Sequence, residues 1–156
     1  MISDTHQQHD NLTLLLDGDS RFDLCIHLGD SETGEEEMAK LLPCPVVMVA
    51  GNNDFFGSMP LEKVIILEGY SIFLCHGHFH RVYLGTKWLK LEAKKRNCQV
   101  AMYGHTHIPY LEETKDLTIL CPGSLSYPRQ EDRLPSYLVM EIDEQGKVNY
   151  QQCYLQ

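Results

Sequence analysis

The sequence has little positive charge and no long apolar stretch. It contains 13 lysines and arginines against 22 aspartates and glutamates, a formal net charge of -9 with neutral histidines. Extended nucleic acids and anionic membranes bind proteins through basic faces, so we expect neither as a partner. No apolar run approaches the roughly 18 residues that a membrane-spanning helix needs, and no signal peptide is recognisable, so the sequence predicts no membrane attachment.

Paired cysteine motifs are also missing. Six cysteines are scattered along the chain, and no two of them form a CxxC pair. This pattern predicts neither a disulfide framework nor an all-thiolate zinc site. We expect free, mostly buried thiols in a reducing compartment, and hence a cytoplasmic protein.

The composition is that of an ordinary globular protein, with 43% hydrophobic residues. The length predicts a single domain over residues 1–156. The opening "MISDTH" leaves room only for the end of a first strand, whereas strands usually run about five to six residues. We therefore expect either a truncated first strand or a natural start that lies upstream. The intact mass of the natively expressed protein would distinguish the two.

Hydrophobic runs divide the first third of the chain into alternating strands and helices. The apolar stretches 22–30 and 45–54 each contain a glycine followed by Asp or Asn, and continuous Val/Ile/Leu runs are typical of strands buried on both faces. Segments 9–18 and 34–43 predict helices from a closing glycine, acidic residues in a first turn and a proline stop. This order predicts a βαβ arrangement with a parallel sheet.

The later chain predicts hairpins around one further helix. We expect a hairpin over 63–78, with a turn at residues 69–70 in which glycine comes first. Segment 85–97 predicts a helix from its Leu/Trp spacing and basic end. Four more strands are expected at 98–107, 117–124, 136–143 and 147–155, the last two joined by a turn at 144–146. The prediction is one α/β domain with parallel pairing first and antiparallel pairing later.

Polar side chains follow the predicted strands where the strands end. In "YGHTHIPY" (103–110), the two histidines are two residues apart, so an extended backbone would send both imidazoles to one face. Ligands in open α/β sheets bind at the carboxyl ends of strands. The metal-competent side chains at such ends are Asp4, His6, Asp30, Asn52, His76, His105 and His107. This mixture suits Mn, Fe or Zn, and seven ligands predict two ions that share a carboxylate.

The order of these short motifs identifies a family. The series "DTH", "GD", "GNND", "HGH" and "GHTH" closely resembles the calcineurin-like metallophosphoesterases, especially the small bacterial and archaeal phosphodiesterases of the YfcE type. Each motif alone is weak, but all five in order make a specific signal. The resemblance extends from residue 2 to about residue 150. It implies a four-layer αββα sandwich with two mixed β-sheets.

The resemblance also implies a role for each ligand position. It assigns a first metal to Asp4, His6 and His107, a second metal to Asn52, His76 and His105, and the bridging position to Asp30. The implied cofactors are two divalent metal ions, with manganese expected first and zinc, iron or nickel as alternatives. By counting, two such ions and two aspartates leave a formal charge of about +2, a cationic pocket in an acidic protein.

The implied reaction is hydrolysis of a small phosphate ester by a hydroxide that two metals activate. The predicted catalytic residues are Asp30, Asn52, Asp54 and His78. Asp54 would orient the loop and the Asn52 amide, and His78 would contact the substrate phosphate. Many members of the superfamily have a histidine where this chain has Asn53, and an amide cannot act as a general acid near neutral pH. We therefore expect modest activity that favours good leaving groups, such as aryl phosphates.

Several other residues have two interpretations. His27 is expected to be a buried structural histidine, and His80 a solvated loop residue. Arg81 and Arg129 either steer a substrate or are surface charges. The aromatic pair Phe55 and Phe56 either stacks on a base or packs in the core. The "CPGS" turn at 121–124 is expected to shape the wall of the site through its backbone, and covalent catalysis by Cys75 next to His76 is disfavoured.

Three functions remain open. The first is the phosphodiesterase, the second is a phosphomonoesterase or nuclease of the same superfamily, and the third is a non-catalytic metal-binding scaffold of the kind represented by a retromer subunit. All seven ligand positions are filled, which favours retained metal. The absence of a basic groove favours a small ester over a large nucleic acid. The apolar "VIIL" at 64–67 makes a homodimer or tetramer a further expectation.

Overall fold

The computed structural model describes residues 1–18, 21–55 and 58–156. Its first elements are α1 (Asp10–Leu16), β1 (Cys25–His27), α2 (Glu35–Leu41) and β2 (Val46–Met48). β1 and β2 pair in parallel, and Ile2 pairs in parallel with the other side of β1. The predicted βαβ arrangement is therefore present, with strands shorter than the apolar runs that signalled them.

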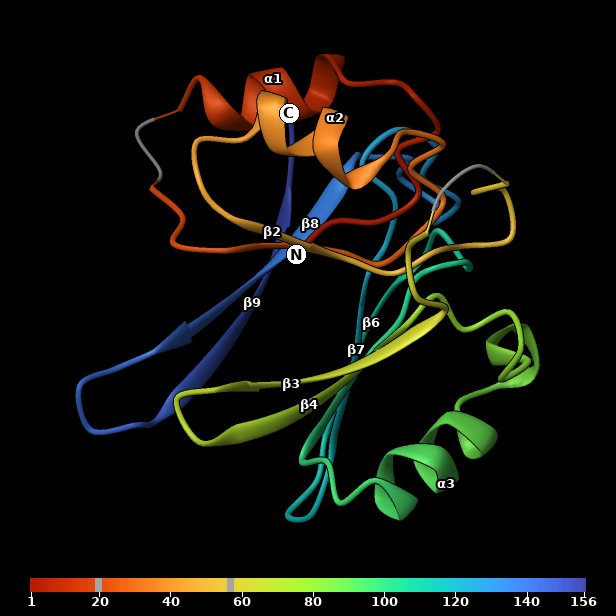
Figure 1. Ribbon diagram of the computed structural model, residues 1–156, viewed down its shortest axis with the longest axis vertical. Coiled ribbons are helices and arrows are strands. Elements are labelled where there is room, and N and C mark those ends of the chain that lie inside the picture. Colours follow the sequence, from red (N-terminus) through yellow and green to blue (C-terminus); the bar gives the residue numbers. More distant parts are fainter. Residues whose placement is uncertain (19–20, 56–57) are drawn as a thin grey trace.

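The N-terminal segment connects this strand pair to the last two strands of the chain. β8 (Ser136–Ile142) and β9 (Val148–Tyr154) form an antiparallel hairpin. Met1 and Leu138 exchange backbone hydrogen bonds of 2.7 and 3.0 Å, so the spatial order is β2, β1, the N-terminal segment, β8 and β9. Both helices of the N-terminal half lie over the outer face of this mixed layer (Figure 1).

The second sheet has five strands in the order β3-β4-β5-β7-β6. Their bounds are Glu62–Leu67 (β3), Tyr70–Cys75 (β4), Val100–Met102 (β5), Pro109–Glu113 (β6) and Thr118–Pro122 (β7). The three central strands are parallel, and each outer strand pairs antiparallel with its neighbour. The 3-10 turn η1 (Val82–Leu84) and helix α3 (Lys87–Lys95) follow β4, and α3 covers the outer face of this sheet (Figure 1).

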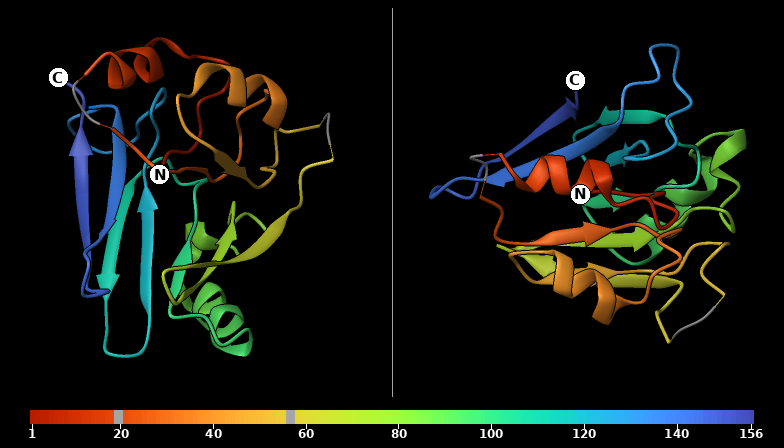
Figure 2. Two further views of the ribbon diagram at one scale, coloured as in Figure 1. Left: turned by 60° about the vertical axis from the view of Figure 1, so that its left-hand side comes forward. Right: turned by 90° about the horizontal axis from the view of Figure 1, so that it is seen from above.

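Hydrophobic side chains hold four layers together. The central cluster joins Ile26, Leu28 and Val49 of the first layer to residues of β4, β5 and β7 in the second. A cluster under α1 and α2 and another under α3 complete the packing. The arrangement is a four-layer αββα sandwich, as the resemblance implies (Figure 2). Strands β1 and β5 are buried at every position because both faces are covered.

Two details of the strand prediction are wrong. The β3–β4 turn consists of Glu68 and Gly69, with φ of 45° and 87°, while Leu67 pairs with Tyr70. Glycine is thus the second turn residue, because both turn positions are left-handed. Strand β6 was not predicted. Its first residue is proline, which an edge strand tolerates because the missing N–H faces away from its neighbour.

The predicted order of pairing also needs correction, because parallel pairs recur at the centre of the second sheet. The crossover from β4 to β5 contains α3, the connection that parallel neighbours require.

Within the described residues, no helix has the length and apolar character needed to cross a membrane.

Candidate metal centre

The loops that follow the N-terminal segment and strands β1, β2, β4 and β5 come together at one edge. Backbone hydrogen bonds link neighbouring loops within each sheet: the Asp4 N–H donates to the Gly29 carbonyl at 3.1 Å, and the Gly104 N–H donates to the His76 carbonyl at 3.1 Å. Between the sheets, the His105 N–H donates to the Asp4 Oδ2 at 3.1 Å. The strands are parallel there, so their carboxyl ends face the same way. This geometry brings together segments that are about a hundred residues apart in sequence.

Five of the seven predicted ligands have a left-handed backbone. Their φ values are 54° for Asp4, 45° for His6, 54° for Asp30, 70° for His105 and 58° for His107. Such a conformation costs a non-glycine residue about 1–3 kcal/mol and persists only where the surrounding structure enforces it. Its concentration at these positions marks the loops as a functional site.

The first group of ligand atoms consists of Asp4, His6 and His107, which all lie within 4.8 Å of one another. The His107 Nε2 is 3.2 Å from the Asp4 Oδ1. The His6 and His107 rings stack with centroids 5.4 Å apart. These are the three residues predicted for the first metal.

The second group shares Asp4 and adds Asp30 and His76. The His76 Nε2 is 3.4 Å from the Asp30 Oδ2 and 3.9 Å from the Asp4 Oδ1. The same Asp30 oxygen is 3.9 Å from the His6 Nε2. Asp30 therefore lies between the two groups, and Asp4 also belongs to both.

Three histidine rings are oriented by hydrogen bonds through Nδ1. His76 donates to the Leu28 carbonyl at 2.7 Å, and His107 donates to the Tyr127 carbonyl at 2.7 Å. His6 donates to the Glu32 carboxylate at 2.6 Å. With the proton on Nδ1, each neutral ring presents a bare Nε2 to the centre, which is the arrangement of metal-binding histidines.

Two buried atoms at the centre have no hydrogen-bond partner among the described residues. They are the Asp4 Oδ1 and the His76 Nε2. Leaving buried polar atoms without partners is costly, and a divalent cation would satisfy both. The residues present therefore fit a metal ion.

Glycines allow the carboxylates to sit this close to the backbone. A Cβ on Gly51 would lie 2.1 Å from the Asp30 Oδ1, and a Cβ on Gly104 would lie 2.0 Å from the Ser3 Oγ. The Ser3 hydroxyl in turn donates to the Asp4 Oδ2 at 2.6 Å. The glycines of "GNND" and "GHTH" are thus needed because a side chain at either position would collide with the centre.

The electrostatics of the centre favour a cation. Burial opposes ionisation of Asp30, but its contacts with His76 and Asn53 outweigh burial and hold the pKa of Asp30 below its usual value. Burial alone would lower the pKa of His76. The neighbouring carboxylates of Asp30 and Asp4 raise it by more, so the pKa of His76 lies above its usual value. Without metal, the two carboxylates therefore favour a proton on His76. A divalent ion would compete with that proton.

Asp54 fixes the loop that carries Asp30. Its Oδ2 accepts the backbone N–H groups of Asp30 and Gly51, both at 2.7 Å, and its Oδ1 accepts the Glu32 N–H at 2.6 Å. Through these bonds Asp54 holds two neighbouring loops in register. Its described contacts are with backbone and with the Ser31 hydroxyl.

The structure distinguishes the two asparagines of "GNND". The side chain of Asn53 donates from Nδ2 to the Asp30 Oδ2 at 2.7 Å, and its backbone N–H donates to the Asp30 Oδ1 at 2.8 Å. Asn52, the predicted ligand, is exposed. Sequence reasoning considered Asn53 only as a missing general acid. In the structure, it is the amide in contact with the candidate bridging carboxylate.

The remaining predicted histidines form a wall beside the second group. The His76 ring centroid is 5.1 Å from that of His105 and 5.4 Å from that of His78. Burial, reinforced by His76 and His105, lowers the pKa of His78 to about 4, so His78 is neutral near pH 7. His80 is not a solvated loop residue: its ring packs against Phe73 and its Nε2 is 3.3 Å from a Glu62 carboxylate oxygen.

Three further expectations, for His27, the "CPGS" turn and Cys75, can be compared with the structure. His27 is fully buried, accepts the Gly29 N–H at Nδ1 and contacts the Thr5 hydroxyl through Nε2 at 3.0 Å. In the "CPGS" turn, the Ser124 hydroxyl donates to the Asp4 carbonyl at 2.8 Å. Burial raises the pKa of the Cys75 thiol, which argues against a thiolate nucleophile beside His76.

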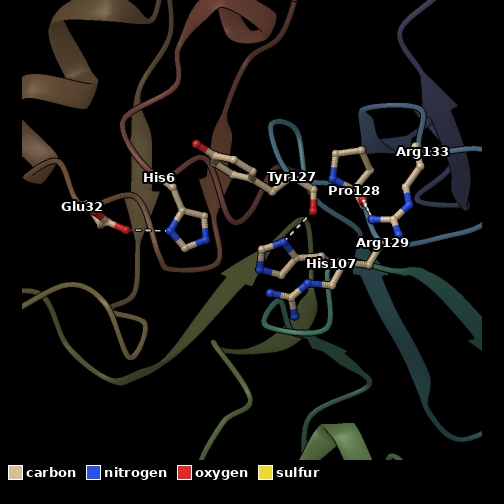
Figure 3. A pocket seen from close by; sticks show the side chains of 7 residues that line it. All are labelled: His6, Glu32, His107, Tyr127, Pro128, Arg129 and Arg133. Carbon is tan, nitrogen blue, oxygen red and sulfur yellow. Dashed lines mark hydrogen bonds and ion pairs between the residues drawn. The ribbon is translucent and has the colours of Figure 1, made fainter.

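A pocket opens from the first group of ligands (Figure 3). Its volume is about 530 Å³, and its lining residues are His6, Glu32, His107, Tyr127, Pro128, Arg129 and Arg133. The sequence had singled out Arg129 but not Glu32, Tyr127 or Arg133. Nothing in their local sequence distinguishes them from other loop residues. Phe55 is 77% exposed, and Phe56 lies outside the described residues.

Comparison of the sequence with models of known protein families gives a match that covers most of the chain. Residues 1–145 match the calcineurin-like phosphoesterase superfamily domain. The chain belongs to this superfamily. Calcineurin-like phosphoesterases use divalent metal ions, and the carboxylate and imidazole groups described above are suited to bind them. The protein is therefore a metal-dependent phosphoesterase by family.

Named relatives agree with this assignment. The chain is 31% identical over 152 residues to a probable metallophosphoesterase of Mycoplasma pneumoniae, covering 96% of this chain and 91% of the relative. It is 37% identical over 93 residues to the phosphodiesterase YfcE of Escherichia coli, covering 54% of this chain and 46% of YfcE.

Solved structures share the fold. A predicted phosphoesterase of Streptococcus pneumoniae superposes with a TM-score of 0.78 at 26% identity, over 99% of this chain and 95% of that one. Vps29 of Entamoeba histolytica in complex with zinc superposes with a TM-score of 0.75 at 21% identity, over 98% and 96% of the two chains. At that identity, the likeness to Vps29 shows the fold alone.

Proposed function

We propose that this phosphoesterase is a dinuclear phosphodiesterase that hydrolyses a small phosphate ester. The observation that supports this proposal best is the pair of adjacent ligand groups that share Asp4. Around them, three Nδ1 hydrogen bonds aim bare Nε2 atoms at the centre. Two ion positions with a common carboxylate are the arrangement used to cleave phosphate esters by in-line displacement.

This proposal assigns the seven predicted ligands to the two metal ions in the same way as the family resemblance does. Asp4, His6 and His107 would hold one ion, His76, His105 and Asn52 the other, and Asp30 would lie between them. The contact of Asn53 with Asp30 makes Asn53 a second candidate for the amide ligand. Manganese is the proposed metal, with zinc, iron or nickel as alternatives, because the mixed oxygen and nitrogen donors suit all of them.

When bound, two divalent ions would activate a water molecule and neutralise charge on the phosphoryl oxygens. The chain's own residues then have two tasks. Asp54 holds the loop of Asp30 in place through backbone N–H groups. His78 is neutral near pH 7 and would donate a hydrogen bond to the substrate phosphate. Asn53 cannot donate a proton to the leaving group, so esters of acidic alcohols should react fastest.

A model diester tests this proposal. Metal-stripped protein should not hydrolyse bis-p-nitrophenyl phosphate, and added manganese should restore turnover. Asp30→Ala should lower the manganese-dependent rate by about 100-fold or more, since it removes a candidate ligand. Asp116→Ala removes the same charge from the exposed β6–β7 turn and should leave the rate unchanged.

The outcomes separate the competing functions. Faster hydrolysis of p-nitrophenyl phosphate than of the diester would favour a phosphomonoesterase. Two bound metal ions, counted by elemental analysis, without turnover of either ester would favour a scaffold.

A homodimer or tetramer remains part of the proposal, because the outer strand β3 exposes Ile66 at 74%. Light scattering on the eluting protein measures that state.

A further inference from the structure

The arginines beside the first ligand group have no assigned partner. Within the described residues, Arg96 forms ion pairs with Glu62 and Glu92, whereas no ion pair involves Arg129 or Arg133. Both line the pocket that opens from His6 and His107. In a chain with a net charge of -9, two guanidinium groups without carboxylate partners next to a candidate metal centre make this pocket electrostatically suited to an anionic ligand.

Arg129 is tied directly to a candidate metal ligand. Its backbone N–H donates to the His107 carbonyl at 3.0 Å, and the Tyr127 carbonyl accepts the His107 Nδ1 proton at 2.7 Å. Segment 127–129 therefore contacts His107 on both sides. Figure 3 shows the Arg129 guanidinium beside the His107 ring. The charge of Arg129 thus lies next to the candidate metal centre.

Arg133 is held at the far side of the same pocket. One of its terminal nitrogens donates to the Pro128 carbonyl at 3.1 Å (Figure 3). A guanidinium has five N–H donors, so most remain free for a ligand. Its backbone is left-handed, with φ of 54°, and its N–H donates to the Gln130 carbonyl. The side chain therefore projects from a turn with internal hydrogen bonds.

Two acidic residues near these arginines, Glu32 and Asp132, have hydrogen-bond partners of their own. Glu32, on the opposite wall of the pocket, accepts the His6 Nδ1 proton at 2.6 Å. Asp132 accepts the backbone N–H of Leu134 at 3.1 Å. Guanidinium groups stay charged at all physiological pH values and match phosphate oxygens with paired hydrogen bonds. The pocket wall is thus suited to a second phosphate.

We propose that Arg129 and Arg133 form a second anion subsite, and that the natural substrate carries another phosphate group besides the one that reacts. This proposal rests on the phosphodiesterase function, because the reacting phosphate must occupy the metal centre. The exposed ring of Tyr127 and the Pro128 ring line the pocket between the arginines and His6 (Figure 3). They would contact the part of the substrate that connects its two phosphates.

Calorimetry on manganese-loaded protein tests the subsite without turnover. The ligands are propane-, pentane- and heptane-bisphosphonate, each compared with the monophosphonate of the same chain length. The best bisphosphonate should bind wild-type protein about tenfold more tightly than its monophosphonate, a ratio typical of a charge-assisted contact. Arg129→Gln and Arg133→Gln should each lower this ratio about threefold to fivefold, and the double variant should bring it near one.

Lys115→Gln is the matched control, since it removes one positive charge at the exposed β6–β7 turn and should leave the ratio unchanged. A ratio near one for every length in the wild type, or a ratio that survives in the double variant, overturns the subsite. If neither ligand binds, the subsite is overturned too. A high ratio without ester hydrolysis supports the subsite and overturns the phosphodiesterase, while hydrolysis with a ratio of one does the reverse.

Discussion

At the scale of the residue, short polar contacts determine the state of each group at the centre. His27 lies beneath the loops without being a candidate ligand. The Gly29 N–H occupies its Nδ1, so the ring is held neutral, with its remaining proton on Nε2 toward Thr5. Burial lowers the pKa of His27 to about 4 from its ordinary 6.5.

This shift predicts a loss of stability in mild acid. The unfolded chain binds a proton at His27 below pH 6.5, whereas the folded protein does so only below about pH 4. The unfolded state therefore takes up more protons between these values, and the free energy of unfolding should fall as the pH drops from 6.5 to 4. The full effect is on the order of 3 kcal/mol.

Urea titrations across this pH range, on wild-type protein and His27→Asn, measure the effect. The asparagine oxygen can accept the Gly29 N–H but does not titrate, so the variant should show a shallower fall between pH 6.5 and 4. Parallel curves for the two proteins would contradict this explanation.

At the scale of the element, packing rather than periodicity decided which face of α3 is buried. Helical spacing predicted the helix, and the structure confirms it over Lys87–Lys95. Leu89 and Ala93 face the second sheet, whereas Trp88 is 52% exposed. The largest apolar side chain of the helix thus lies outside the core.

A pair of leucine substitutions tests this orientation. Leu89→Ala should lower the free energy of unfolding by about 2–5 kcal/mol, because it leaves a cavity against the sheet. Leu91→Ala makes the same chemical change at a side chain that is 45% exposed and should cost less than about 1 kcal/mol. Urea denaturation measures both, and equal costs would show that the helix packs differently.

At the scale of the whole molecule, the candidate metal centre connects the two sheets. Asp4 and Asp30 come from the first layer, while His76 and His107 follow strands of the second. An ion bound among them would join segments that unfolding separates. Metal binding should therefore stabilise the fold as a whole.

Manganese at 100 times its dissociation constant should add about 2.7 kcal/mol of stability. For a chain of this size, this corresponds to a rise in Tm of about 5–10 °C. Thermal unfolding followed by circular dichroism, with chelator and then with manganese, measures the shift. Asp30→Ala should abolish it and Asp116→Ala should preserve it. An unchanged Tm in wild-type protein at millimolar manganese would contradict metal binding at this centre.

The sequence by itself determined which segments form buried strands and which polar residues follow them, because continuous apolar runs and their glycine stops are local signals. The order of the short polar motifs, through the family resemblance, implied the layered fold and the meeting of Asp4, Asp30, His76 and His107. Tertiary structure alone decided that β6 forms an edge strand, that Asn53 contacts Asp30, and that Arg129 lies against His107. Each of these depends on how one loop docks on another across the two sheets, and such docking leaves no periodic or compositional trace in the chain.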